Sequence, residues 1–222
     1  MQTNDKFEAL LNQIEFLYER YSLEPRATTQ PYVLATANKQ IKNYEYKPED
    51  LLVRERLIEH VGSLPIMAIT FFPYIDDPQV SLGDAMTMLA IHDIGELVVG
   101  DEITFTKISA GKGSEEKAAL SLLHPSYHDL YKDVESKSSQ TAKFAKAIDK
   151  ITPDIVDYLT PADITIMRMK HFTGVDVDGI VPLIEKHKRP YMLWNRFMTE
   201  FHVYLLDMLA AKISSPLTKT ET

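Results

Sequence analysis

The stretch LAIHDIGELVVGD, residues 89–101, has Leu, Ile and Val residues on both sides of polar ones, as in a helix with a buried face. Three titratable residues, His92, Asp93 and Glu96, nevertheless lie in its middle. Burying such groups without partners costs several kcal/mol, so within an apolar segment they are normally paired with other charges or bound to a metal ion. We therefore expect other parts of the chain to supply partners for these side chains.

Apolar residues recur every three or four positions along most of the chain, a spacing typical of amphipathic helices. Ser81 is the predicted cap of the helix that contains the quoted stretch, Gly100 is its predicted end, and Pro65 predicts a kink or break in an earlier helix. No segment alternates with a period of two for long enough to predict a sheet. We expect an all-α helical bundle that forms one domain over residues 1–222. The helices are predicted over residues 5–22, 48–74, 82–99, 115–124, 139–158, 179–188 and 191–213.

Two segments between these helices are predicted to be loops. Residues 22–31 read SLEPRATTQP, and residues 106–114 read TKISAGKGS, both rich in residues that favour turns. Ser114 at the end of the second segment is a predicted cap of the helix that follows.

Composition narrows the possible functions. The 222 residues are 45% hydrophobic and 25% charged, as in ordinary globular proteins. The net charge of -8 argues against a nucleic-acid polymer as partner, because such binding depends on many Lys and Arg contacts to phosphates. The beginning of the chain lacks the pattern of a signal peptide, and no stretch approaches the roughly 18 apolar residues of a membrane span. A cytoplasmic protein without a membrane partner is therefore expected.

The residue types available for a metal site are restricted, because the chain contains no Cys. His60, His92, Asp93 and Asp149 lie on three predicted helices and together offer two imidazoles and two carboxylates. This donor set suits one divalent ion such as Mn, Co, Fe, Ni, Zn or Mg. Any one of these residues could be an ordinary core residue, but the combination favours a metal site. Because successive helix residues diverge by about 100°, His92 and Asp93 can share an ion only if it lies between their two directions.

Three segments carry a resemblance to a known family. They are RERLIEH at residues 54–60, HDIGELVVGDE at residues 92–102 and KAIDK at residues 146–150. The sequence resembles the HD-superfamily metal-dependent phosphohydrolases over about residues 54–151, and most of all their 5′-deoxynucleotidase branch. The resemblance implies an HD-domain helical bundle in which His60, His92, Asp93 and Asp149 bind the metal ion. It also implies that the substrate is a small phosphoester, which in the 5′-deoxynucleotidase branch is a nucleotide.

The resemblance also implies roles for residues around the metal. Glu96 falls on the Glu of the family's HDxxE element and would transfer protons, and Asp101 falls on the Asp of its GD element, where it could orient water or hold a sugar hydroxyl. Arg54 and Arg56 precede His60 and are candidates for binding the substrate phosphate. An Arg-Trp pair that many of these nucleotidases carry upstream is missing, since the only Trp is Trp194.

Two other functions stay open. Nucleotide pyrophosphohydrolases of the guanosine tetraphosphate hydrolase type belong to the same superfamily, but they typically show HDxxED, whereas residue 97 here is Leu. A non-catalytic helical binding protein with a relic site is the other possibility, although all four candidate ligands are present. The Met- and aromatic-rich last helix is interpreted as core or as the interface of a homodimer.

Overall fold

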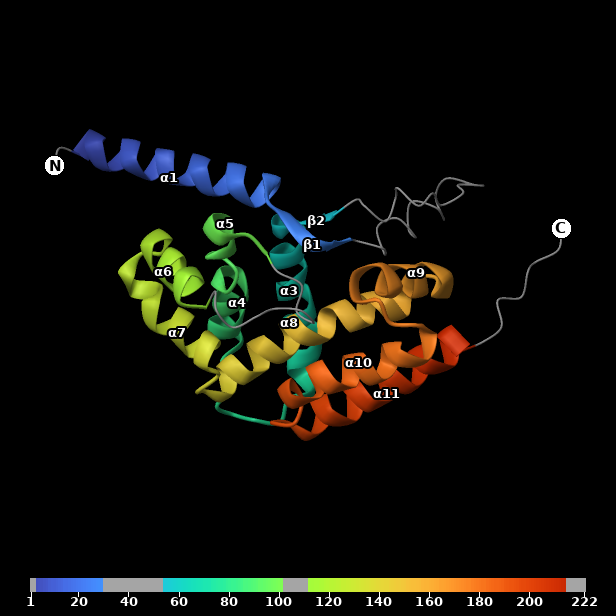
Figure 1. Cartoon of the computed structure of the whole chain (residues 1–222). Helices are drawn as coiled ribbons and strands as arrows, with labels where there is room; N and C mark the ends of the chain where they lie inside the picture. The colour runs from blue at the N-terminus through green and yellow to red at the C-terminus, as the bar shows by residue number, and fades with distance from the viewer. Residues whose placement is uncertain (1–2, 30–53, 102–111, 215–222) are drawn as a thin grey trace.

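Helix α8 (Gln140–Leu159) crosses the middle of the molecule, and α3, α4, α7 and α11 pack against it, whereas α1 lies apart from it along one edge (Figure 1). The computed structural model describes residues 3–29, 54–101 and 112–214. Its elements are α1 (Thr3–Leu23), β1 (Pro25–Thr29), β2 (Arg54–Arg56), α3 (Leu57–Phe71), η2 (Phe72–Tyr74), α4 (Leu82–Ile91), α5 (Glu96–Val99), α6 (Lys112–Leu122), η4 (Pro125–Tyr127), α7 (His128–Ser136), α8 (Gln140–Leu159), α9 (Ala162–Thr173), α10 (Val177–Lys188), η5 (Arg189–Tyr191) and α11 (Arg196–Ser214). The predicted all-α bundle is confirmed.

The largest apolar cluster surrounds α8. Phe144, Ala145 and Ile148 are fully buried against residues of α3, α4 and α11. These positions are three and four apart, so they lie on one face of the helix, as the sequence pattern predicts. Burying this face holds α8, and with it Asp149, in a fixed position relative to α3 and α4.

Two smaller apolar clusters extend the bundle. One joins α9, α10 and α11 through residues such as Met169, Ile184 and Leu209. The other lies under α1 and includes Ile94 and Leu97, which follow the His-Asp pair. Within the part of the chain that the structure describes, no helix combines the length and apolar character needed to cross a membrane.

Several predicted helix boundaries are confirmed. The Ser81 side chain accepts a hydrogen bond from the backbone N–H of Asp84 at 3.3 Å and so caps α4. Ser139 caps α8 in the same way, accepting from the N–H of Ala142 at 3.0 Å. Gly100 ends α5 with a φ of 82°, a backbone conformation that favours glycine. The break predicted at Pro65 is wrong, because α3 continues through this residue.

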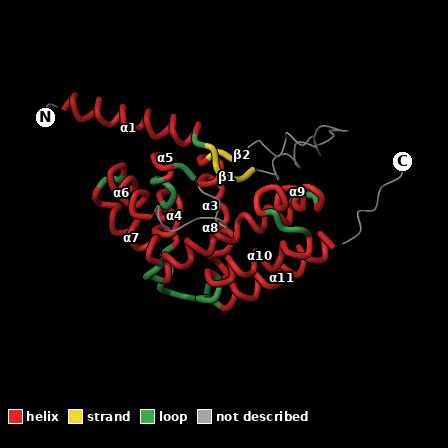
Figure 2. The backbone as a smooth tube through the Cα atoms, viewed as in Figure 1, coloured by secondary structure: helices red, strands yellow, loops and turns green. Residues whose placement is uncertain are grey.

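A two-stranded antiparallel sheet replaces parts of a predicted loop and a predicted helix (Figure 2). The loop prediction for residues 25–29 is wrong, as is the helix prediction for residues 54–56. The backbone of Arg56 is extended, and its N–H donates to the Glu59 side chain at 2.6 Å, so α3 begins only at Leu57. Residues 48–53 of the predicted helix lie outside the described residues.

Other boundaries also differ from the prediction. Helix α6 begins at Lys112, so Ser114 lies within it and does not cap it, whereas residues 106–111 of the predicted loop lie outside the described residues. The last helix begins at Arg196 and not at residue 191, because the Asn195 side chain accepts from the N–H of Met198 at 3.1 Å. Helices α7 and α9 were not predicted. Their apolar residues nevertheless recur three and four positions apart. Tyr131 and Val134 of α7 are buried in this way, and Ala162, Ile166 and Met169 of α9 belong to one apolar cluster.

Candidate metal centre

The His-Asp pair lies in a break between two helices. The predicted single helix over residues 82–99 is wrong, because α4 ends at Ile91 and α5 begins at Glu96. Between them the chain makes tight turns, with hydrogen bonds from the N–H of Ile94 to the carbonyl of Ile91 at 3.1 Å and from that of Glu96 to the carbonyl of Asp93 at 3.0 Å. As a result the adjacent His92 and Asp93 face a common point, with Nε2 of His92 3.0 Å from Oδ1 of Asp93.

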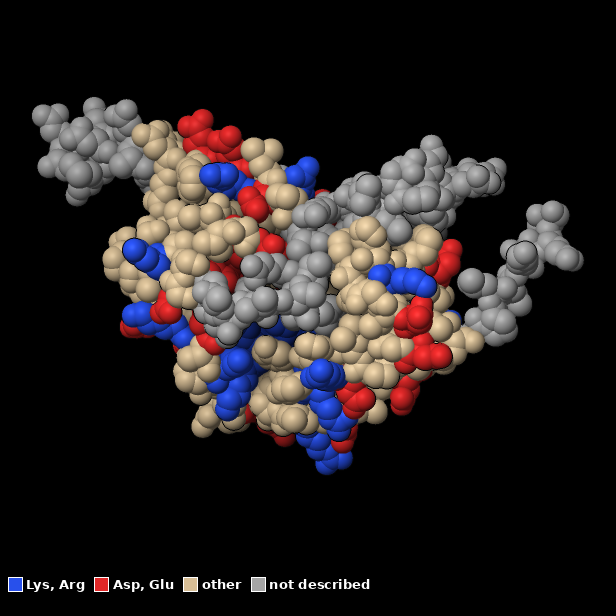
Figure 3. Space-filling view, in the orientation of Figure 1, with Lys and Arg blue, Asp and Glu red and all other residues tan. Residues whose placement is uncertain are grey.

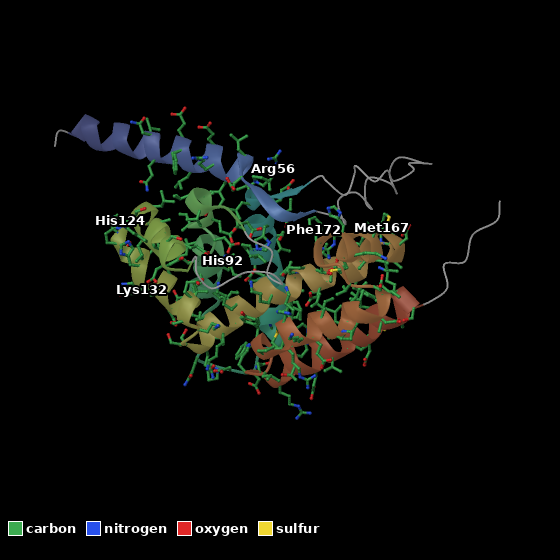
Figure 4. All side chains as sticks on the ribbon, in the orientation of Figure 1. Arg56, His92, His124, Lys132, Met167 and Phe172 are labelled. Carbon is green, nitrogen blue, oxygen red and sulfur yellow. The ribbon has the colours of Figure 1, made fainter. Side chains whose placement is uncertain are left out.

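Two further helices bring a side chain each to the same point. His60 of α3 has its Nε2 3.5 Å from Oδ2 of Asp93 and 3.4 Å from Oδ1 of Asp149, which belongs to α8. Nε2 of His92 is 3.5 Å from the same Asp149 oxygen. His60, His92 and Asp149 are buried, and Figure 4 shows His92 in the interior of the bundle. All four residues that the sequence analysis selected as metal ligands therefore lie together.

The orientation of His92 is fixed by its second ring nitrogen. Nδ1 of His92 lies 2.8 Å from the carbonyl oxygen of Leu89, and because a carbonyl only accepts, Nδ1 carries the hydrogen. Nε2 is then directed at the carboxylates, an arrangement typical of metal-binding histidines. Burial lowers the pKa of His92, but Asp93 and Asp149 outweigh this effect and raise it to about 9. For the carboxyl group of Asp149, burial has the opposite effect and raises the pKa. The positive charges of Lys150 and His92 outweigh burial and hold this pKa well below its usual range.

The donor atoms fit a divalent ion. One ligand atom each from His60, His92 and Asp149 lies within 4.8 Å of the others. Among the described residues, Nε2 of His60 and Nε2 of His92 are buried without a hydrogen-bond partner, which is costly unless a ligand is bound there. The cluster of two imidazoles and carboxylates therefore suggests a divalent metal ion.

Comparison with known proteins shows the family to which the chain belongs. A family model described as HD domain matches residues 49–174, more than half of the chain and a range that contains all four candidate ligands. The chain belongs to the HD-domain family. The predicted membership of the HD superfamily is thereby confirmed.

A solved structure supports the HD-domain fold. It is described as a predicted metal-dependent phosphohydrolase from Magnetospirillum magnetotacticum MS-1, and it is similar with a TM-score of 0.62 and 23% sequence identity, over 91% of this chain and 96% of that chain. At this identity the likeness concerns the fold alone. The comparison with curated proteins finds no match.

Two acidic residues that are predicted to act in the reaction, Glu96 and Asp101, follow the His-Asp pair. Glu96 is the first residue of α5 and is buried, and Asp101 follows Gly100 and is half-buried. Burial, followed by the charges of Asp93 and Glu96, raises the pKa of Tyr21 on α1. The roles of Glu96 and Asp101 remain predictions.

The two candidate phosphate-binding arginines lie before His60. Arg56 is exposed, and its Nη1 donates to the carbonyl of Leu23 at 2.7 Å, which ties β2 to the end of α1 (Figure 4). Arg54 belongs to β2, but its side chain lies outside what the structure describes. Arg56 thus has a structural contact, and phosphate binding by either residue remains a prediction.

Two lysines of α8 were missed as site residues by the sequence analysis. Nζ of Lys150 lies 2.9 Å from Oδ2 of Asp149, the carboxylate oxygen that does not approach the histidines. Nζ of Lys146 lies 2.7 Å from Oε1 of Glu135 on α7. The sequence shows only that they adjoin Asp149, because KAIDK has a lysine three residues before it and another directly after it, but their burial cannot be seen there.

Proposed function

We propose that the chain is a metal-dependent phosphohydrolase that removes the 5′-phosphate from nucleoside or deoxynucleoside monophosphates. Its metal ligands would be His60, His92, Asp93 and Asp149. The observation that carries the proposal is the convergence of these four side chains, from α3, the α4–α5 turn and α8, on one point in the HD-domain fold. A bound divalent ion supplies a Lewis acid that activates water and offsets phosphate charge.

The protein's own residues have separate tasks in this reaction. The Leu89 carbonyl holds the His92 ring in the orientation that presents Nε2. Glu96, the first residue of α5 and four residues after His92, is proposed to take a proton from the attacking water or to give one to the leaving 5′-oxygen. Asp101 is proposed to orient water or a sugar hydroxyl.

The substrate class rests on the motif resemblance and on one feature of α5. Pyrophosphohydrolases of the superfamily carry a second carboxylate after the motif Glu, but this position is Leu97. Leu97 is 2% exposed and packs in an apolar cluster with Ile94 and Leu57. A carboxylate there would be buried among apolar side chains, which favours a monophosphatase over a pyrophosphohydrolase.

The proposal is tested by product analysis. Protein loaded with Mn or Co is incubated with matched nucleoside mono-, di- and triphosphates, and released phosphate and pyrophosphate are measured. We expect phosphate, released fastest from monophosphates, and no release by Asp149→Asn protein. Pyrophosphate as the main product would instead support the pyrophosphohydrolase alternative. If no nucleotide released phosphate or pyrophosphate, the nucleotidase proposal would be wrong.

A further inference from the structure

Two lysines on one face of α8 lie next to the metal cluster. Lys146 and Lys150 are four residues apart, so their side chains leave the helix in nearly the same direction, with Asp149 in the intervening turn. Figure 3 shows Lys and Arg side chains gathered over α8, close to acidic ones. The two lysines are therefore candidates for a cationic part of the site.

Both lysine side chains are largely buried. Their exposed fractions are 13% for Lys146 and 21% for Lys150. Lysine is seldom buried to this degree without an anion, because its ammonium group loses hydration. Their present anions are Glu135 and Asp149 respectively, and the charges of Asp149 and Asp93 also act on Lys146.

A third lysine of this region, Lys188, already contacts a backbone carbonyl and a carboxylate. Lys188 of α10 donates to the carbonyl of Lys150 at 3.0 Å and lies 4.0 Å from Oδ1 of Asp154. Its side chain is 5% exposed. It supports the backbone of α8 beneath the two lysines and is not counted among the candidate ligand-binding cations.

Metal binding would change the charge balance around Lys146 and Lys150. A divalent ion would add two positive charges beside Asp93 and Asp149. Asp149 is the ion-pair partner of Lys150, and both carboxylates also act on Lys146, which keeps its own partner Glu135. An additional anion would then compensate the two ammonium groups, that of Lys150 most of all, and a phosphate group carries two negative charges and accepts several charge-assisted hydrogen bonds.

We infer that Lys146 and Lys150 bind the phosphate group of the substrate. This inference rests on the proposed phosphohydrolase function and assigns to α8 the task that the sequence analysis gave to Arg54 and Arg56. The phosphate would lie against α8, held on one side by the ligand cluster and on the other by the two ammonium groups.

Binding of inorganic phosphate to the metal-loaded full chain, measured by titration calorimetry, tests the inference without relying on turnover. Lys146→Gln and Lys150→Gln should each weaken phosphate binding by about 10- to 100-fold, the usual effect of losing a hydrogen bond to a charged group. Lys146→Arg should keep most of the affinity. The matched control is Lys132→Gln, an exposed position on the neighbouring α7, which should bind phosphate as the wild type does.

Elemental analysis of each variant shows whether weaker phosphate binding results from loss of the lysine or from loss of the metal ion. If Lys150→Gln loses the metal, Lys146→Gln decides, because Lys146 is paired with Glu135 and not with a candidate ligand. Unchanged phosphate affinity in metal-loaded Lys146→Gln protein, or no phosphate binding by the wild type, would overturn the inference. Hydrolysis with an unchanged KM in both variants would refute the lysine role alone, whereas phosphate binding through the lysines without any hydrolysis would refute only the proposed function.

Discussion

Gly95 lies between the His-Asp pair and α6, where the structure leaves no room for a side chain. A Cβ atom at this position would lie 2.5 Å from the backbone oxygen of Glu115 and 2.9 Å from its Cγ. A backbone atom cannot move aside as the end of a flexible side chain can. The glycine in HDIGE is therefore explained by the close approach of α6 to the turn that carries His92 and Asp93.

Replacing Gly95 by Ala should destabilise the protein by about 1–3 kcal/mol, the usual cost of overpacking. The measurement is the free energy of unfolding in urea. Gly83→Ala is the matched control, because Gly83 lies in α4 and nothing lies within 4 Å of an added Cβ. A Gly95→Ala protein as stable as the Gly83→Ala protein would contradict the close-contact explanation.

Glu96 tests the proposed division between metal binding and proton transfer. Glu96→Gln removes the ionisable carboxylate but keeps its size, so metal content should stay unchanged while kcat falls by about 10²- to 10⁴-fold, the usual contribution of general acid-base catalysis. Elemental analysis and phosphate release, measured on the same preparation, separate the two effects. An unchanged kcat would mean that Glu96 has only a structural role.

At the scale of elements, the break between α4 and α5 is a feature that local sequence did not predict. Apolar spacing predicted one helix through residues 82–99, since the spacing itself continues across the turn. The turn depends on packing against α6 at Gly95, a contact between segments that local spacing does not contain. The combination of these residue types in the sequence, together with the family resemblance, selected His60, His92, Asp93 and Asp149. That their side chains meet at one point follows only from the packing of α3, α4 and α8.

The short strands and the α8 lysines were missed for similar reasons. Residues 25–29 and 54–56 are too short to show a period of two, and their pairing joins distant parts of the chain. Lys146 and Lys150 resemble ordinary surface lysines in sequence. Their burial follows from the position of α8 in the middle of the bundle, which emerges only from the assembled fold.

A second buried charged pair joins α8 to α9. Arg168 donates to the carboxylate of Asp157, and both side chains are buried. Asp157→Ala should destabilise the protein by about 3–5 kcal/mol, because removing one partner leaves the other charge buried. Urea unfolding measures this loss.

The control for the α8–α9 pair is Glu200→Ala, which removes the partner of Arg196 from an exposed pair within α11. Exposed pairs contribute little, so this variant should unfold as the wild type does. Equal stability of the Asp157→Ala and Glu200→Ala proteins would show that the buried pair does not stabilise the α8–α9 contact.

His202 makes the packing of α11 sensitive to acid. Burial, with the charges of Arg189 and Lys188 acting against Glu185, lowers its pKa to about 4, and Nε2 of His202 lies 3.8 Å from Asp154. Between pH 6.5 and about 4 the unfolded chain binds a proton that the folded protein does not, so the free energy of unfolding falls as the pH falls.

His202→Gln removes this proton-binding group. Between pH 7 and pH 5 the variant should lose about 1–2 kcal/mol less stability than the wild type, as measured by urea unfolding at both pH values. The same loss of stability in both proteins would contradict a depressed pKa at His202.

At the scale of the whole molecule, α8 connects the apolar core of the bundle to the candidate metal site. Its buried apolar face forms the centre of the bundle, Asp149 belongs to the candidate metal site, and Asp157 ties the helix to α9. Family membership, the all-α fold and the meeting of the four candidate ligands agree with one another. The central claim is that this meeting point binds one divalent ion.

Elemental analysis of purified protein tests that claim most directly. The wild type, Asp93→Ala and Asp129→Ala proteins are incubated with Mn or Co and then freed of unbound metal, with Asp129 serving as an exposed aspartate on α7. We expect about one ion per chain in the wild type and in Asp129→Ala, and none in Asp93→Ala, because one ligand of the set is lost. Stoichiometric metal in the Asp93→Ala protein, or none in the wild type, would contradict the account.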